Sequence, residues 1–357
     1  MRLGIIGLPS SGKTTLFNAL SRSNLPTGEM SGGDRVEVHT SAVDVPDERL
    51  VEVSKIFNPK KTTTTKVTYA DIGGLTIGAG RDGLPGELVN QLEQVDGLLL
   101  VVRAFENPAV PHPHGDLDPA RDVGQVMAEF ILHDMVTVER RLEKLEEDRQ
   151  KGGRDKGEIE REQALFTRLM EVLGGDEPLR DADLTDEERQ RVGGFGLLSL
   201  TPILVVYNTS EEGIPIGPVE EQGGDPLLLV HGKIEMEIAQ LPPEDEGDFL
   251  AEYGISEPGR ERVIRASYDT LGLLTFFTGN DEEARAWTLR RGSTCLEAAD
   301  TIHSDMARGF IRAEVIAWDE LVALGSLADA RAQGKLRVEG KEYIVSDGDV
   351  LYIRFNV

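Results

Sequence analysis

Short apolar runs alternate with amphipathic stretches along the chain. Five of these runs are continuous rather than alternating, which is typical of strands buried on both faces of a parallel sheet. Stretches whose apolar residues have helical spacing follow several of these runs. The alternation therefore predicts an α/β fold with a mostly parallel sheet. The five predicted strands are Leu3–Ile6, Val67–Ile72, Gly97–Val102, Ile203–Tyr207 and Leu227–Val230.

A long stretch of different character separates the third and fourth predicted strands. Apolar residues recur there at intervals of three and four between Val123 and Leu145, and charged residues fill the other positions. A glycine-containing turn over 152–157 leads into a second helical run, Glu158–Leu173. The pattern predicts an inserted antiparallel helical hairpin, with an ordinary pair of domain helices as the alternative. Thr185 with Glu188 fits a capping box for a further short helix.

The C-terminal quarter changes character again. Short strand patterns alternate with helical patches, and Asp347-Gly348-Asp349 is typical of a turn between two strands. A small α+β domain is therefore expected. The predicted strands are Leu273–Thr278, Ala286–Leu289, Ala313–Ala317, Glu342–Val345 and Val350–Phe355, and the predicted helices lie near Leu296–His303 and Asp319–Ala323.

The first predicted strand runs directly into Gly7-Leu8-Pro9-Ser10-Ser11-Gly12-Lys13-Thr14, and a helical run, Thr15–Leu20, follows. The segment matches the phosphate-binding pattern G-x-x-x-x-G-K-[ST] without a mismatch. Its backbone N–H groups can surround phosphate oxygens, the Lys13 ammonium can reach the β- and γ-phosphates, and the Thr14 hydroxyl can ligate Mg²⁺. The strand–helix context disfavours a chance glycine-rich turn. The predicted nucleotide-binding residues are Gly7, Pro9, Ser10, Ser11, Gly12, Lys13, Thr14 and Thr15.

Asp71-Ile72-Gly73-Gly74 ends the second predicted strand and matches D-x-x-G. In switch NTPases this Asp reaches Mg²⁺ through water, and the glycine N–H senses the γ-phosphate. Thr14 and Asp71 are therefore the predicted metal ligands, and Gly74 is a predicted nucleotide contact.

Asn208-Thr209-Ser210-Glu211 follows the fourth predicted strand, where a GTPase would carry N-K-x-D. The Asp of that motif accepts two hydrogen bonds from guanine. Glu211 is one methylene longer and the lysine is absent, which favours adenine while guanine stays open. An ordinary strand-end turn is the alternative. The predicted base-binding residues are Asn208, Glu211, His231, Gly232 and Lys233.

Composition narrows the class of protein. The chain has 357 residues, enough for two or three domains, and a net charge of −26, which disfavours general binding to nucleic acids. Residues 275–357 carry 14 acidic and 10 basic residues, so most of the acidic excess lies before them. One cysteine, Cys295, cannot form an internal disulfide. No apolar run approaches the ~20 residues of a membrane span, so a cytoplasmic protein without a membrane partner is expected.

These motifs, in this order, resemble the YchF group of Obg-related P-loop NTPases. The resemblance covers essentially the whole chain. Its most specific part is C-terminal, because many positions match in register. The matching segments there are Arg285-Ala286-Trp287-Thr288, Phe310-Ile311-Arg312-Ala313-Glu314, Gly340-Lys341-x-Tyr343-Ile344-Val345-x-Asp347-Gly348-Asp349-Val350 and Phe355-Asn356-Val357.

The resemblance implies a Ras-like P-loop NTPase domain, an inserted antiparallel helical hairpin and a C-terminal TGS domain of β-grasp type. It also implies hydrolysis of ATP, with GTP as the alternative, to the diphosphate and phosphate. The implied partner is a ribosomal particle, or an rRNA- or tRNA-containing complex, bound through the TGS and helical domains. The expected divisions are 1–122 with 198–272 for the nucleotide domain, 123–197 for the helical domain and 273–357 for the TGS domain.

Members of this group lack the glutamine that orients the hydrolytic water in Ras-like proteins. Leu75, which follows Gly74 here, agrees with that, because an apolar side chain cannot orient water. The resemblance implies a histidine on a loop instead. His112 is the matching residue, so His112 and Lys13 are the predicted catalytic residues. His114 is a rival, and a surface-loop histidine without a catalytic role is the alternative for both.

The first switch segment departs from the group. Ser31–Val36 stands where the group carries Phe-Pro-Phe-x-Thr, so Arg35 replaces the threonine expected to close on Mg²⁺, and Thr40 is the nearest hydroxyl. Two hypotheses stay open. One is a slow hydrolysing switch with responsive loops near Gly33–Thr40 and Gly73–Gly83, and the other is a binding module without useful hydrolysis. A small-molecule P-loop kinase is a weaker third hypothesis, because it needs neither an N-x-x-E motif nor a TGS domain.

Overall fold

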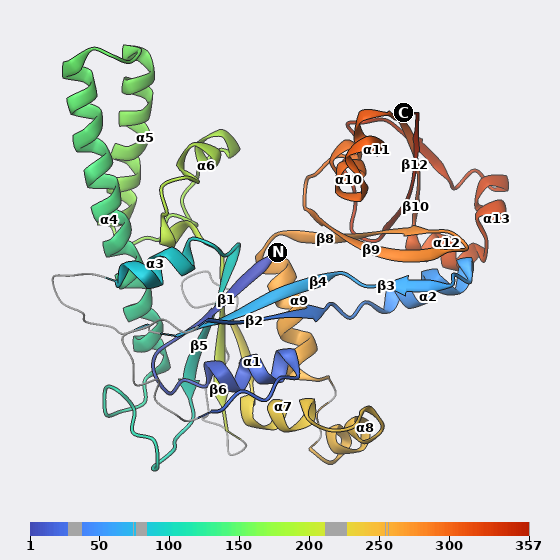
Figure 1. The fold of residues 1–357 in the computed structure, drawn as a ribbon, viewed down its shortest axis with the longest axis horizontal. Coiled ribbons are helices and arrows are strands. Elements are labelled where there is room, and N and C mark those ends of the chain that lie inside the picture. Colours follow the sequence, from blue (N-terminus) through green and yellow to red (C-terminus); the bar gives the residue numbers. More distant parts are fainter. Residues whose placement is uncertain are drawn as a thin grey trace. The chain divides into compact units, whose positions relative to one another are not determined.

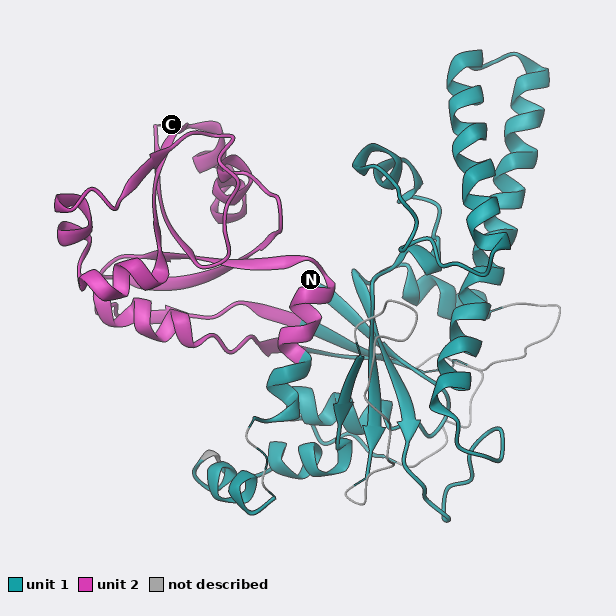
Figure 2. Ribbon diagram, turned by 180° about the vertical axis from the view of Figure 1, so that it is seen from behind, with its two compact units in different colours: residues 1–41, 68–263 teal, residues 42–67, 264–357 magenta. Residues whose placement is uncertain are grey.

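A computed structural model of the chain contains two compact units (Figures 1 and 2). The first unit comprises Met1–Ser41 and Thr68–Val263, and the second comprises Ala42–Val67 and Ile264–Val357. The residues that the structure describes are 1–27, 38–73, 75, 84–210, 227–253, 255 and 257–356.

The first unit is built on a six-stranded sheet with the strand order β2-β4-β1-β5-β6-β7. Neighbouring strands from β4 through β7 pair in parallel, so the five strands predicted from continuous apolar runs are confirmed. The edge strand β2 was not predicted, because most of its residues are exposed or half-buried and form no apolar run. The strands are β1 Arg2–Ile6, β2 Val38–Asp44, β4 Lys66–Ile72, β5 Gly97–Ala104, β6 Ile203–Thr209 and β7 Leu227–Val230.

Helices cover both faces of this sheet. The central strand β5 is buried at every residue, as a strand covered on both sides must be. Leu100 and Val102 of β5 belong to one apolar cluster with Leu88 of α3 and Phe130 of α4, whereas α1 and α7 lie on the opposite face (Figure 1). The helices are α1 Lys13–Ser21, α3 Gly86–Leu92, α7 Gly232–Ala239 and α8 Pro243–Glu252, with a short 3₁₀ turn at Leu198–Leu200. Helix α9, Gly259–Thr270, belongs to this unit as far as Val263 and to the second unit from Ile264.

The predicted helical hairpin is present as α4 Pro119–Lys151 and α5 Lys156–Gly174, which project together from the sheet (Figure 1). Asp118 and Asp155 cap the two N-termini, and Gly152 ends α4 in the left-handed conformation that glycine tolerates best. The capping box predicted at Thr185 is confirmed, and it begins α6 Asp186–Val192. None of the described helices combines the length and the apolar character that crossing a bilayer requires.

A fully buried carboxylate holds the hairpin to the sheet unit. Asp134 of α4 is 0% exposed and accepts hydrogen bonds from the N–H of Leu198 (2.7 Å) and from the N–H (2.8 Å) and hydroxyl (2.6 Å) of Ser199. All three donors are at the 3₁₀ turn that leads into β6. The Asp134 carboxylate therefore provides hydrogen-bond acceptors for buried N–H groups of the turn that have no partner in a helix or strand.

Replacement of Asp134 with alanine is expected to lower the free energy of unfolding by about 3 kcal/mol, because it leaves buried donors without a partner. Urea denaturation followed by circular dichroism measures this. The exposed Glu143 on the same helix provides the matched control, and Glu143→Ala should change stability by less than about 0.5 kcal/mol. Equal urea midpoints for Asp134→Ala and Glu143→Ala would contradict a stabilising role of the Asp134 hydrogen bonds.

The second unit is a mixed sheet with the strand order β11-β10-β12-β8-β9-β3. The parallel pair β12–β8 lies at its centre, and antiparallel partners flank it on both sides. This β-grasp arrangement carries α10, whose N-terminus shows a second capping box at Thr294. The strands are β3 Lys61–Thr63, β8 Leu273–Gly279, β9 Glu283–Arg290, β10 Phe310–Ala317, β11 Arg337–Glu339 and β12 Asp349–Phe355, and the helices are α2 Glu48–Phe57, α10 Cys295–Ile302, α11 Ser304–Arg308, α12 Trp318–Leu324 and α13 Leu327–Ala332.

One strand predicted in this unit is wrong. Glu342–Val345 forms an isolated bridge from Ile344 to Thr294 instead of a strand, and Asp347-Gly348-Asp349 therefore leads into β12 alone. The segment is short and mostly apolar, as a strand would be. Its backbone groups, however, bond to the start of α10, where Cys295 N–H donates to Tyr343 O at 2.8 Å.

Residues 42–67 contribute to the second unit although they lie near the N-terminus. Strand β3 extends the sheet by pairing in parallel with β9, and Arg49 of α2 forms ion pairs with Asp47 (2.8 Å) and Asp347 (2.6 Å). Contacts between segments far apart in the sequence therefore define this unit. The division predicted from the sequence placed residues 42–67 with the nucleotide domain, and that three-part division stays a proposal.

Candidate nucleotide-binding site

The loop between β1 and α1 has a backbone shape that only glycine accommodates at two positions. Gly7 has φ +152° and Gly12 has φ +94°. A Cβ at Gly7 would lie 2.1 Å from Val101 O, and one at Gly12 would lie 2.1 Å from Asn208 Nδ2. Ser10 also has positive φ, at 63°. The loop is thus fixed by close approach of neighbouring strands, as a phosphate-binding turn requires.

Lys13 begins α1 and folds back over the loop. Its ammonium donates to the carbonyl oxygens of Gly7 and Leu8, at 2.9 Å each. Burial lowers the pKa of Lys13 from 10.5 to about 8, and the nearby Asp71 carboxylate opposes part of that shift. Among the described residues its hydrogen-bond partners are these two carbonyl oxygens, so the ammonium is a suitable partner for an anion such as phosphate.

Thr14 and Asp71 meet directly beside Lys13. The Thr14 hydroxyl donates to Asp71 Oδ2 at 2.8 Å, and Asp71 is buried at the end of β4. Burial raises the pKa of Asp71, while the Thr14 hydrogen bond and the Lys13 charge oppose the rise. A hydroxyl and a carboxylate are the hard oxygen donors that Mg²⁺ prefers, so these residues fit that ion. No cluster of three or more His, Cys, Asp or Glu side chains suited to a metal occurs among the described residues.

Asn208 at the end of β6 links two loops. Its Nδ2 donates to Ser11 O, and its Oδ1 accepts from the N–H of Gly232, each at 3.0 Å. The side chain is buried, so both halves of the amide serve the protein itself. The predicted base-binding residues Asn208 and Gly232 are thus brought together, with Asn208 tying the phosphate loop to the start of α7.

The remaining predicted residues are placed as follows. His231 Nδ1 and Thr209 Oγ1 are 2.9 Å apart, and Lys233 is exposed on α7. Pro9 is exposed, and Thr15 is half-buried in the first turn of α1. Thr40 is exposed in β2, and Leu75 is buried. Gly74, Glu211, Arg35 and the rest of Ser31–Val36 lie outside the described residues, as do most of the two predicted responsive loops.

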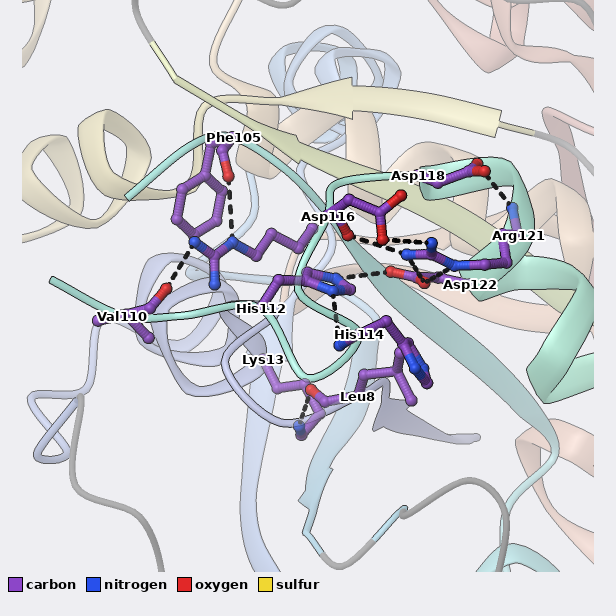
Figure 3. Close-up of polar contacts among 11 residues, drawn as sticks. Leu8, Lys13, Phe105, Val110, His112, His114, Asp116, Asp118, Arg121 and Asp122 are labelled. Atoms are coloured by element: carbon purple, nitrogen blue, oxygen red, sulfur yellow. Dashed lines mark hydrogen bonds and ion pairs between the residues drawn. The ribbon is translucent and has the colours of Figure 1, made fainter. Parts of the chain in front are cut away.

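His112 is held by hydrogen bonds at both ring nitrogens. Its side chain is 5% exposed, and Nε2 lies 2.9 Å from Asp122 Oδ2 (Figure 3). Nδ1 accepts the backbone N–H of His114 at 3.2 Å. Because Nδ1 accepts, Nε2 carries the proton and donates to the Asp122 carboxylate. The rival His114 is exposed.

Comparisons with known proteins identify the family of the chain. A family model described as "50S ribosome-binding GTPase" matches residues 2–138, and a YchF-type GTPase C-terminal model, described as a protein of unknown function, matches residues 273–356. The chain is 39% identical to the "Ribosome-binding ATPase YchF" of Bacillus subtilis, over 99% of each chain. It is 38% identical to the protein of the same name from Pasteurella multocida, over 100% of this chain and 99% of the relative. The chain belongs to the YchF family.

A solved structure supports the same assignment at the level of the fold. The YchF GTPase of Schizosaccharomyces pombe superimposes with a TM-score of 0.85 at 27% sequence identity, covering 99% of this chain and 97% of the other. The Ras-like domain with its helical hairpin and the C-terminal β-grasp domain are therefore those of a YchF protein.

Two residues near the site of this YchF-family chain escaped the sequence analysis. Arg103 is a buried arginine near the end of β5, and Asp122 is the partner of His112 in the first turn of α4. Arg103 could have been noticed in the sequence, because it is a charged residue directly after the apolar run that ends at Val102. Asp122 gave none, because acidic residues are common in the first turn of a helix.

Proposed function

We propose that this chain is a nucleotide-dependent switch that binds ATP together with Mg²⁺ and hydrolyses it slowly to ADP and phosphate. The observation that carries the proposal is the phosphate loop with Lys13 folded over it and the Thr14–Asp71 pair beside it. GTP is the alternative substrate.

The residues of the loop have separable tasks. The backbone N–H groups from Gly7 to Thr14, except at Pro9, would surround the phosphate oxygens, and Lys13 would exchange its two carbonyl partners for them. Thr14 and Asp71 would hold Mg²⁺. The bound ion would neutralise charge that develops on the phosphate oxygens during transfer.

His112 is the proposed water-positioning residue. Leu75 is buried and apolar, so it cannot orient a water. With its proton on Nε2 and bonded to Asp122, His112 keeps a lone pair on Nδ1 that could accept a proton from water in exchange for the His114 N–H.

The base would be read by backbone and side-chain groups at the ends of β6 and β7. Asn208 would shape this pocket indirectly, because its amide is bonded to Ser11 and Gly232. Glu211, His231 and Lys233 are the proposed residues nearest the base. The absence of an N-K-x-D motif favours adenine.

The proposed partner is a ribosomal particle, in keeping with the ribosome-binding names of the bacterial relatives. The TGS domain, 273–357, and the helical domain, 123–197, would form its docking surface. The nucleotide domain would comprise 1–122 and 198–272. We also propose a cytoplasmic location and no membrane partner.

The proposal is tested by titrating purified protein with ATP and with GTP in the presence of Mg²⁺, by calorimetry, and by measuring phosphate release. Tighter binding of ATP, with a shift towards GTP in Glu211→Asp, supports the ATPase assignment. Tighter binding of GTP to the parent protein would make the chain a divergent GTPase. Binding without phosphate release would make it a nucleotide-responsive interaction module. Cosedimentation with ribosomal particles, with and without nucleotide, tests the partner.

The low pKa of Lys13 predicts a pH effect on binding. Above pH 8 the free protein progressively loses the Lys13 proton, whereas bound phosphate favours the charged form, so binding must take up a proton. Nucleotide affinity is therefore expected to fall about ten-fold per pH unit above pH 8. Calorimetry at pH 9 in two buffers of different ionisation enthalpy measures the uptake. Lys13→Arg stays charged and should show none, and zero uptake by the parent protein would contradict the prediction.

A further inference from the structure

Arg103 carries a buried charge for which the described residues provide no carboxylate. The residue is 4% exposed, and the hydrogen-bond partners of its guanidinium are backbone carbonyls. Burial lowers the pKa of Arg103. Its Nη1 is buried and has no hydrogen-bond partner within the described part of the chain. Burying a guanidinium without a carboxylate partner costs free energy, and an apolar side chain could fill the same space without that cost.

The three carbonyls belong to the segment that leads to His112. Arg103 Nε donates to Phe105 O at 3.1 Å, and Nη2 donates to Val110 O at 2.8 Å (Figure 3). Nη2 also donates to Asn107 O at 3.4 Å. The guanidinium also lies over the Phe105 ring, 4.8 Å from its centroid. The guanidinium is a planar fork of N–H donors in fixed positions, so it can bind several carbonyls at once. One side chain thereby sets the backbone path of the six residues 105–110.

Asp122 holds the other end of the same segment. It accepts from His112 Nε2 at 2.9 Å, and Arg121 donates to its second oxygen at 3.3 Å. His112 is two residues beyond Val110, the last carbonyl that Arg103 binds. The position of the imidazole is therefore set by one anchor from β5 and one from α4.

We propose that Arg103 is a positioning residue for nucleotide hydrolysis, which acts by holding the backbone of residues 105–110 so that His112 is presented on Asp122. The inference rests on the proposed function of His112. Within the described part of the chain, no hydrogen bond joins Arg103 to Lys13 or to the Thr14–Asp71 pair. Loss of its fork should therefore affect turnover more than nucleotide binding.

The test is a double-mutant cycle in the full-length protein, read out as single-turnover hydrolysis of Mg²⁺–ATP and as the Kd for ATP. Arg103→Lys keeps the charge but loses the fork, and it is expected to lower the hydrolysis rate about ten-fold with Kd changed less than about two-fold. His112→Ala is expected to lower the rate about 10²-fold. In the His112→Ala background, Arg103→Lys should have almost no further effect, because the residue it positions is gone.

A purely structural role gives a different result. Equal rate losses from Arg103→Lys in both backgrounds, or a parallel loss of ATP affinity, would overturn the inference. Phe105→Leu, which removes only the ring beneath the guanidinium, should lower the rate in the same direction and provides the readout if Arg103→Lys does not fold. If hydrolysis is normal in His112→Ala, the proposed function of His112 is the part that fails and the inference fails with it. If His112→Ala is slow but Arg103→Lys is not, only the inference fails.

Discussion

Replacing Lys13 with alanine is expected to lower the rate of nucleotide hydrolysis about 10³-fold, the range seen when one preorganised charge-stabilising group is removed from a catalytic site. The physical reason is the position of the ammonium. It is desolvated, which strengthens its interaction with phosphate, and it is held 2.9 Å from two carbonyls of the loop that would surround the phosphates. Without it, charge developing on the transferred phosphoryl group has no cation from the protein in the described site.

Single-turnover phosphate release at saturating Mg²⁺–ATP measures this effect. Lys13→Arg should be intermediate, because the charge persists while the larger planar group does not fit the loop. Lys151→Ala removes an exposed lysine from α4 and is the matched control. Comparable rates for Lys13→Ala and Lys151→Ala would show that the phosphate loop is not the catalytic site.

Asn208→Ala is expected to weaken nucleotide binding about 10²-fold and to lower the free energy of unfolding by about 2–4 kcal/mol. The substitution leaves Ser11 O and the Gly232 N–H, both in buried surroundings, without the partners that now lie 3.0 Å away. It also removes the only side chain that joins the phosphate loop to the start of α7 through hydrogen bonds in the described structure. Both loops should then sample other conformations before nucleotide binds, which costs affinity.

Asn208→Asp separates the two bonds. The carboxylate can still accept from Gly232, but it cannot donate to Ser11 O and would place a negative charge against that carbonyl. We therefore expect Asn208→Asp to bind nucleotide at least as weakly as Asn208→Ala. Calorimetric titration and urea denaturation supply the two readouts, and Asn90→Ala, at an exposed position of α3, is the control. If the Asn208 variants bind nucleotide with the affinity of the parent protein, the hydrogen bonds from Asn208 to Ser11 and Gly232 have no role in binding.

The sequence predicted the strands of the first unit correctly where a continuous apolar run corresponds to a strand buried on both faces of the sheet. The runs that became β1, β4, β5, β6 and β7 needed no knowledge of partners, because continuous apolar strands occur mainly in covered parallel sheets. The helical hairpin and the capping box at Thr185 are likewise local, since the cap involves residues only three positions apart. The predicted strand at Glu342–Val345 failed for the converse reason. Its short apolar run resembles that of a strand, but its backbone partners lie at the start of α10.

The sequence by itself determined the phosphate loop, the parallel core and the hairpin, because a contiguous motif and a periodic apolar pattern encode their own local conformation. Only the tertiary structure decided which groups Asn208 and His112 bond to. Asn208 bonds to Ser11, which is 197 positions away in the sequence, and the ring of His112 is held by the first turn of α4. Tertiary contacts also placed residues 42–67 with the C-terminal sheet. A hydrogen bond between distant segments has no periodic signature, because folding alone brings its donor and acceptor together.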